Sequence, residues 1–239
     1  MKKPRAVICD VYGTLLEVGV GPTDVESRWR ELCRRAFGAD PGRSWVDYQE
    51  ALRSEVRRVR SGDQERGVAV PEVVWEDVVG AVLPELLQVA RSERDIFLLE
   101  QAGLTHQVRL LPGVGAVLAR WKEEGIVLGI ASNAQPYSEA ELERELATEG
   151  LSLGMFDNDV SFWSWRHGFA KPDPHVFQVL KVRLRRRGID PGHVLMIGDR
   201  LDNDMGPARA CGWGAWHLSR VPGHDPGGDW RCLAEWWWG

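Results

Sequence analysis

The chain has 239 residues, of which 44% are hydrophobic and 27% are charged, and its formal net charge is −5. This balance is typical of a globular protein, and the acidic excess argues against a surface that binds nucleic acid or anionic lipid. No apolar run approaches the roughly 20 residues needed to cross a membrane. The four cysteines are scattered, which indicates reduced thiols. We therefore expect a cytoplasmic protein that does not bind nucleic acid or a membrane.

Short apolar runs alternate with helical patterns along most of the chain. The first run, residues 5–10, is typical of a buried strand and leads through Asp10 to the turn former Gly13. Similar runs follow at residues 126–131, 193–197 and 214–218. Helices are predicted between them, beginning near Gly113 and Pro174. The alternation predicts an α/β fold with a doubly wound parallel sheet, whose ligands bind at the carboxyl ends of the strands.

One long segment interrupts this alternation. Between residues 17 and 110 no strand run is evident, and helical spacing recurs instead, as in Val25, Trp29 and Leu32. A crossover between parallel strands needs only about a dozen residues, so this segment is too long for a simple connection. We predict an α-helical cap at residues 17–110, inserted into a core made of residues 1–16 and 111–239.

Four short motifs lie at the boundaries of these elements. They are DVYGTL at residues 10–15, ASN at 131–133, AKPDP at 170–174 and IGDRLDND at 197–204. Taken singly, acids at strand ends, Ser-Asn pairs and a lysine before proline are common in turns and helix caps. Their joint occurrence, each at an element boundary, indicates a site that binds an anion and a divalent metal.

These motifs, with a helical insertion after the first, make the chain resemble the haloacid dehalogenase (HAD) superfamily of hydrolases over nearly its whole length. The resemblance implies that Asp10 is a covalent nucleophile. It also implies that Ser132 binds the transferred group and that Lys171 balances the charge between that group and the nucleophile. Thr14 and Asn133, which belong to the same motifs, are expected to contact the substrate.

The same resemblance implies a magnesium cofactor. Asp10, Asp199 and the main-chain carbonyl of Tyr12 are the expected ligands. Asp204 is expected as a further ligand or as a group that orients one, with Asp202 as the competing choice. A cation and a lysine would offset the repulsion between a carboxylate nucleophile and a phosphate, and would stabilise the charge on the transferring oxygens.

The first motif departs from the phosphatases of this superfamily at position 12. These enzymes usually carry an aspartate there, which protonates the leaving oxygen and then activates water, whereas this chain has Tyr12. With tyrosine at this position, the first motif resembles that of the haloacid dehalogenases, which displace halide without a metal. The fourth motif, in contrast, keeps the pattern of the phosphatases. Loss of general acid–base catalysis, typically worth about 10²–10⁴-fold, would impair a phosphatase without abolishing its activity.

We favour a magnesium-dependent phosphatase of small phosphorylated molecules with a weakened general-acid step. Three alternatives stay open: a 2-haloacid dehalogenase, a regulatory member that has lost turnover, and a dimeric interaction module. The last depends on Trp236, Trp237 and Trp238, which cannot all face one core from a single helix. We therefore expect at least one of them to be exposed or covered by a partner chain, as in a homodimer.

Overall fold

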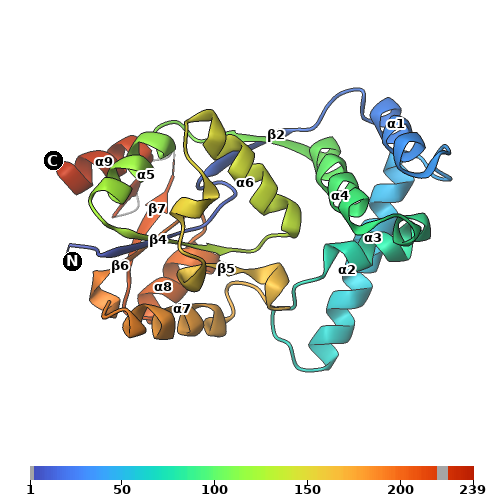
Figure 1. The fold of residues 1–239 in the computed structure, drawn as a ribbon. Helices are drawn as coiled ribbons and strands as arrows, with labels where there is room; N and C mark the ends of the chain where they lie inside the picture. The colour runs from blue at the N-terminus through green and yellow to red at the C-terminus, as the bar shows by residue number, and fades with distance from the viewer. Residues whose placement is uncertain (1–2, 220–225) are drawn as a thin grey trace.

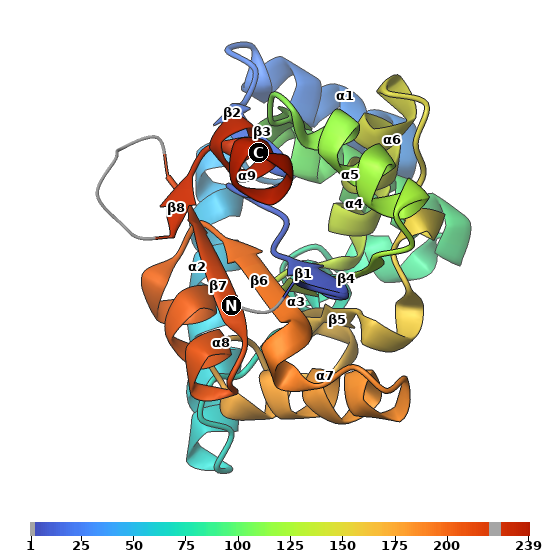
Figure 2. The same cartoon turned by 90° about the vertical axis from the view of Figure 1, so that its left-hand side faces the viewer.

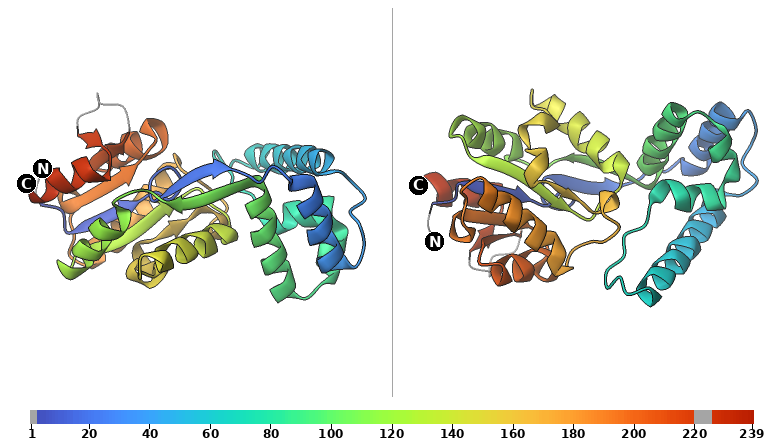
Figure 3. Two further views of the ribbon diagram at one scale, coloured as in Figure 1. Left: turned by 90° about the horizontal axis from the view of Figure 1, so that it is seen from above. Right: turned by 60° about the horizontal axis from the view of Figure 1, so that its bottom comes forward.

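The computed structural model describes residues 3–219 and 226–239, which form two lobes (Figure 1, Figure 3). The larger lobe contains the main sheet, and the smaller lobe is built from the helices between residues 25 and 105. The C-terminal helix and the segment that leads into the first strand lie on the larger lobe, at the side farthest from the smaller one (Figure 1).

The larger lobe is organised around a six-stranded sheet with the strand order β5-β4-β1-β6-β7-β8, in which all neighbouring strands pair in parallel. The strands are β1 (Ala6–Cys9), β4 (Val127–Ser132), β5 (Phe162–Trp163), β6 (Val194–Gly198), β7 (Gly214–Leu218) and β8 (Gly227–Gly228). In the centre, Cys9 of β1 lies opposite both Ile130 of β4 and Ile197 of β6. The predicted parallel α/β sheet is therefore confirmed.

Helices cover both faces of this sheet (Figure 2). One face carries α5 (Val114–Glu123), α6 (Pro136–Thr148) and α9 (Trp230–Trp238), and the other carries α7 (Pro174–Arg186) and α8 (Gly206–Ala210). Successive side chains of a strand point to opposite faces. Accordingly, Val7 and Cys9 belong to the hydrophobic cluster under the first group of helices, and Ile8 belongs to the cluster under the second.

The smaller lobe has a hydrophobic core of its own. Its elements are α1 (Val25–Phe37), α2 (Trp45–Glu65), α3 (Trp75–Val82), the 3₁₀ segment η1 (Pro84–Gln88) and α4 (Arg91–Thr105). Trp29 of α1 is fully buried, and its ring stacks on Tyr48 of α2 with 4.3 Å between the ring centroids. Phe97 of α4 packs edge-on against the same tryptophan. These three aromatic residues thus fill the lobe itself.

The connection between the lobes corrects one expectation. The sequence predicts no strand between residues 17 and 110, and this prediction is wrong at both ends of the segment. β2 (Leu16–Val20) pairs antiparallel with β3 (His106–Leu110), and the two strands join the lobes (Figure 1). Val18 and Val20 are exposed, so β2 lacks the alternating burial that makes a strand recognisable.

A second joint lies between the segment after α2 and the loop before α7. Ala170 N donates to Val70 O at 3.0 Å, and Glu72 N donates to Gly168 O at 3.0 Å. Because Ala170 directly precedes Lys171, this joint attaches the helical lobe beside the third sequence motif.

The buried Glu72 carboxylate completes this joint from the helical side. It accepts hydrogen bonds from Ser164 Oγ at 2.7 Å and from Gln135 Nε2 at 3.2 Å, and both of these residues belong to the larger lobe. The main-chain N–H of Val73 donates to the same carboxylate at 3.0 Å. A buried carboxylate with several donors is a costly contact to break, because each donor would lose a charged acceptor.

Replacing Glu72 with alanine should therefore lower the free energy of unfolding by about 1–3 kcal/mol, since Ser164 and Gln135 would keep buried polar groups without this acceptor. Urea denaturation of Glu72→Ala measures the change. Glu65→Ala is a matched control, because Glu65 is exposed at the end of α2. Equal stability of the two variants would show that the carboxylate does not hold the joint.

The C-terminal tryptophans differ in their surroundings. Trp237 and Trp238 pack against Trp121 with ring centroids 4.9 and 6.2 Å apart, whereas Trp236 is 43% exposed. One helix has thus turned two of the three rings toward the core, while the homodimer stays a prediction.

Over residues 3–219 and 226–239, no helix is long and apolar enough to span a membrane, and the four cysteines are free.

Candidate functional site

Three predicted site residues follow the ends of neighbouring strands. Asp10 comes directly after β1, Ser132 is the last residue of β4, and Asp199 directly follows β6. Because β1 lies between β4 and β6 in a parallel sheet, the carboxyl ends of these strands meet at one edge. The structure therefore brings together the three residues that the sequence places at strand ends.

Three carboxylates gather at this edge. One oxygen from each of Asp10, Asp199 and Asp204 lies within 4.8 Å of the others. Asp204 is fully buried on the π-helical turn that follows β6. Asp202, on the same turn, is exposed and pairs with Arg200 at 2.7 Å. Of the two competing acids, the structure places Asp204 in the cluster and Asp202 outside it.

Two glycines permit this close approach. Gly13 has a φ of +76°, and a Cβ atom at this position would overlap the Asp199 carboxylate. A Cβ atom at Gly198 would overlap the carboxylate of Asp204. Glycine adopts positive φ without steric cost and leaves space for a neighbouring group. The turn after Asp10 and the end of β6 thus require glycine if the acids are to occupy these positions.

A buried lysine lies among the acids. Lys171 Nζ is 2.8 Å from Asp10 Oδ1 and 2.5 Å from Asp204 Oδ1. The side-chain amide of Asn133 is engaged by the main chain of Lys171, with hydrogen bonds of 2.7 and 2.8 Å. Burial opposes the charge of Lys171, but the two acids outweigh it and hold the pKa of the lysine above its ordinary value. The site therefore contains a fixed positive charge beside Asp10.

Asp199 and Asp204 are held in an environment that disfavours their charge. Burial, with a further contribution from Asp10, raises the pKa of Asp199. Burial raises the pKa of Asp204 to about 6; Lys171 opposes this rise and Asp10 adds to it. A cation bound among the three carboxylates would offset both the burial and the mutual repulsion.

Several buried oxygen atoms of the site have no partner. Ser132 Oγ, Thr14 Oγ1 and Asp199 Oδ1 make no hydrogen bond within the part of the chain that the structure describes. Unpartnered buried polar atoms are costly unless a ligand engages them. Magnesium prefers oxygen ligands such as carboxylates. The residues present therefore fit a magnesium ion with an anion beside it.

Helix α6 engages the hydroxyl of Tyr12. This hydroxyl donates to Glu141 Oε2 at 2.5 Å and lies 2.8 Å from Ser138 Oγ. Glu141 is buried and also lies 3.1 Å from His106 Nε2 of β3. Burial is the main cause that raises the pKa of Tyr12, and the negative charge of Glu141 raises it further, so the phenol stays protonated. Neither partner of Tyr12 was predicted from the sequence. The i, i+3 spacing of Ser138 and Glu141, which puts both on one helix face, is the signal that could have indicated them.

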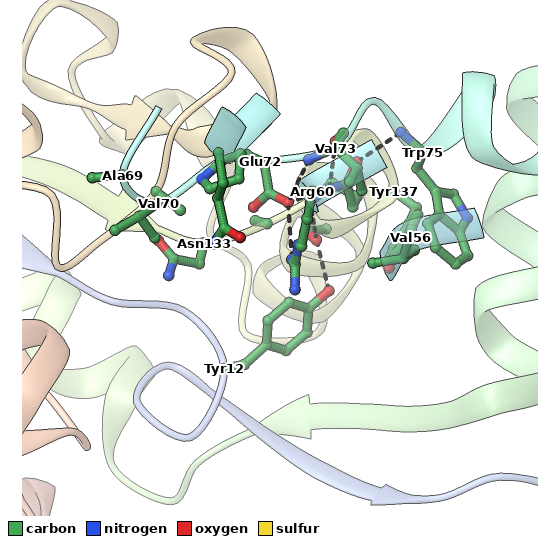
Figure 4. A pocket seen from close by; sticks show the side chains of 16 residues that line it. Tyr12, Val56, Arg60, Ala69, Val70, Glu72, Val73, Trp75, Asn133 and Tyr137 are labelled. Atoms are coloured by element: carbon green, nitrogen blue, oxygen red, sulfur yellow. Dashed lines mark hydrogen bonds and ion pairs between the residues drawn. The ribbon is translucent and has the colours of Figure 1, made fainter. Parts of the chain in front are cut away.

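Two cavities border Tyr12. The first, of about 480 Å³, lies between the lobes, with Tyr12 and Asn133 on one side and Arg60 of α2 on the other (Figure 4). The second, of about 690 Å³, reaches Gly13 and Asp199. Both volumes are typical of sites for small molecules. Because Tyr12 lines both cavities, its side chain contributes to the boundary between them.

Comparison with known proteins supports the resemblance drawn from the motifs. Residues 4–212 match the family model of the haloacid dehalogenase-like hydrolases. A glyceraldehyde 3-phosphate phosphatase from Pyrococcus furiosus is 29% identical over 105 residues, which are 44% of this chain and 40% of that protein. The chain thus aligns with less than half of the length of this curated relative.

Solved structures share the fold at lower sequence identity. An L-2-haloacid dehalogenase aligns over 100% of both chains with a TM-score of 0.54 and 20% identity. The HAD hydrolase YfnB from Bacillus subtilis, bound to magnesium, aligns over 100% of both chains with a TM-score of 0.53 and 18% identity. The family match over residues 4–212 shows that this chain belongs to the haloacid dehalogenase-like hydrolases.

Proposed function

We propose that this protein is a magnesium-dependent phosphatase of small phosphorylated molecules. The observation that carries the proposal is the cluster of Asp10, Asp199 and Asp204 at one edge of the sheet. Phosphoryl transfer to a carboxylate needs cations to offset like charges, whereas metal-free displacement of halide does not require three acids in one place. The partial match to a phosphatase of a small sugar phosphate supports the same reaction class.

The proposed reaction has two steps. In the first, a carboxylate oxygen of Asp10 attacks the phosphorus atom, and the bond to the leaving oxygen breaks with its electron pair, which gives an aspartyl phosphate. In the second, water attacks the phosphorus atom and loses a proton to solvent. The bond between phosphorus and Asp10 then breaks, which releases phosphate and restores the carboxylate.

The other residues of the site stabilise the transferring group. The protonated Lys171 offsets negative charge beside Asp10, and the free Ser132 Oγ supplies a hydrogen bond to a phosphoryl oxygen. Magnesium, when bound by Asp10 and Asp199, would supply further positive charge at the phosphoryl oxygens. Asp204 also pairs with Lys171 Nζ, at 2.5 Å, and thereby orients it beside Asp10.

We also propose that residues 17–110 act as a cap on a core of residues 1–16 and 111–239. The ribbon of β2 and β3 and the joint at Glu72 are two separate contacts between the lobes, and the cavity of about 480 Å³ lies between them. A cap in this position would exclude water from the reacting groups during transfer.

Magnesium should raise the melting temperature of the wild-type protein by about 5–10 °C at a concentration near 100 times its dissociation constant, because a ligand stabilises only the state that binds it. Asp199→Ala should lose most of this shift, since it removes one of the clustered carboxylates. Thermal unfolding at graded magnesium concentrations measures both effects.

Asp202→Ala is the matched control for this measurement. Asp202 lies three residues after Asp199, on the π-helical turn, but is exposed and outside the cluster, so the variant should keep the full magnesium shift. A wild-type protein that magnesium does not stabilise would contradict the metal site.

A second candidate function is supported by a specific observation. The Tyr12 hydroxyl is bound to Glu141, so position 12 offers no acid for a leaving alkoxide, which suits a 2-haloacid dehalogenase. A release assay with phosphate esters and 2-halo acids, with and without magnesium, separates the two functions. Magnesium-dependent release of phosphate supports the phosphatase. Metal-independent release of halide would replace it with the dehalogenase.

A further inference from the structure

The cavity between the lobes is lined by one cationic side chain. Among the described residues around it, this side chain is Arg60 of α2, which projects from the helical lobe toward Tyr12 (Figure 4). The Arg60 side chain is 50% exposed, and its ion-pair partner is Glu72 Oε1 at 3.6 Å, which is too long for a hydrogen bond. The guanidinium thus has donors available to a molecule that enters the cavity.

Glu72 does not depend on Arg60 for its own partners. Its carboxylate already accepts hydrogen bonds from Ser164, Gln135 and the main chain of Val73. Arg60 can therefore turn to a ligand without leaving a buried acid unpaired. A guanidinium carries five N–H donors in a planar fork that matches the two oxygens of a carboxylate.

The same cavity begins next to the reacting groups. It is lined by Tyr12, two residues after the nucleophile Asp10, and by Asn133, which is hydrogen-bonded to the main chain of Lys171. Its volume of about 480 Å³ is enough for a small organic molecule. A substrate whose phosphoryl group reaches Asp10 and whose carbon chain occupies this cavity would extend toward Arg60.

We propose that Arg60 binds a carboxylate carried by the substrate, so that small phosphorylated acids are preferred. This inference rests on the proposed phosphatase function and names its substrate class. A carboxylate fits this position better than a second phosphate, because Glu72 is close to Arg60 and would repel a dianion more than a monoanion. Apolar and aromatic walls, which suit a short carbon chain, are contributed by Val56, Val73, Trp75 and Tyr137.

Two stable phosphonates test the inference without turnover. In 3-phosphonopropionate a carboxylate takes the place of the terminal methyl group of propylphosphonate, so the pair differs in the group expected at Arg60. Calorimetric titration in the presence of magnesium should give the wild-type protein about tenfold tighter binding of the carboxylate compound, because a half-exposed charged hydrogen bond lies at the low end of its usual range.

Arg60→Gln should reduce this preference to about one, and Arg60→Lys should restore part of it, since lysine keeps the charge but not the fork. Arg57→Gln is the matched control. Arg57 lies on the same helix, is 63% exposed and pairs with Glu50, so its loss should leave the preference unchanged. Arg60→Gln should melt at the wild-type temperature, which separates a loss of selectivity from a loss of folding.

The outcomes distinguish this inference from the proposed function. A preference near one in the wild type, or an undiminished preference in Arg60→Gln, would overturn the role of Arg60 alone if phosphate esters are still hydrolysed. If neither phosphonate binds and no phosphate ester is hydrolysed, the phosphatase function is wrong and the substrate class falls with it.

Discussion

Replacing Asp10 with asparagine should abolish turnover, with a decrease in kcat on the order of 10⁴-fold or more. Asparagine has nearly the size of aspartate, but its amide is a poor nucleophile. The variant would also leave Lys171 paired with Asp204 alone. Phosphate release measures the loss. Mass spectrometry of quenched reactions should find a phosphoryl group on the peptide that contains Asp10 in the wild type and not in the variant.

Asp202→Asn is the matched control for this experiment. It makes the same chemical change at an acid that is exposed and lies outside the cluster, so its activity should stay close to that of the wild type. An Asp10→Asn protein that still turns over substrate at a rate close to the wild-type rate would contradict the assignment of the nucleophile.

The sheet could be predicted because its central strands are continuous apolar runs, as buried parallel strands are. β1 and β6 are buried at every position, and the sequence already shows both. β2 and β3 could not be predicted in the same way. Their outer residues are exposed, and each strand depends on a partner from the other end of the insertion. β2 in particular is specified by its long-range pairing with β3 and not by local periodicity.

The residues of the site also fall into two groups: those whose position follows from the order of the strands, and those whose position depends on tertiary structure. Asp10 and Asp199 could be brought together from the sequence, because parallel strands present their carboxyl ends at one edge. Asp204 could not be separated from Asp202, since their difference in burial arises from a π-helical turn. Arg60 could not be distinguished from the other charged residues of α2 by sequence, because it lines a cavity that forms only where the two lobes meet.

The structure also shows which groups fix the hydroxyl of Tyr12, which the sequence alone does not reveal. Tyr12 is tied to Glu141 by a short hydrogen bond, and its phenol stays protonated because its pKa is raised by burial and by that acid. The proton is therefore directed at α6 and not at a leaving group beside Asp10. If the protein is a phosphatase, departure of the leaving group depends on the substrate: alkyl phosphates should react poorly, and acyl or activated aryl phosphates should react well.

Tyr12→Asp should then increase kcat/KM for alkyl phosphates by up to the ~10²–10⁴-fold that general acid catalysis typically contributes, and should increase it least for acyl phosphates. The smaller side chain would also open the boundary between the two cavities, so misplacement of the substrate would reduce part of the gain. The measurement is kcat/KM for both proteins across phosphate esters of graded leaving-group pKa. The expected result is a steep dependence in the wild type and a shallow one in the variant.

Tyr12→Phe is the matched control, because it keeps the ring at the boundary and removes only the hydroxyl. Its dependence on leaving-group pKa should equal that of the wild type, while its stability should fall by about 1–3 kcal/mol, since buried Glu141 loses a donor. A large loss of alkyl phosphatase activity in Tyr12→Phe would instead identify the phenol as the proton donor. Wild-type rates that do not vary with leaving-group pKa, under conditions where chemistry limits kcat/KM, would show that the missing acid does not limit this enzyme.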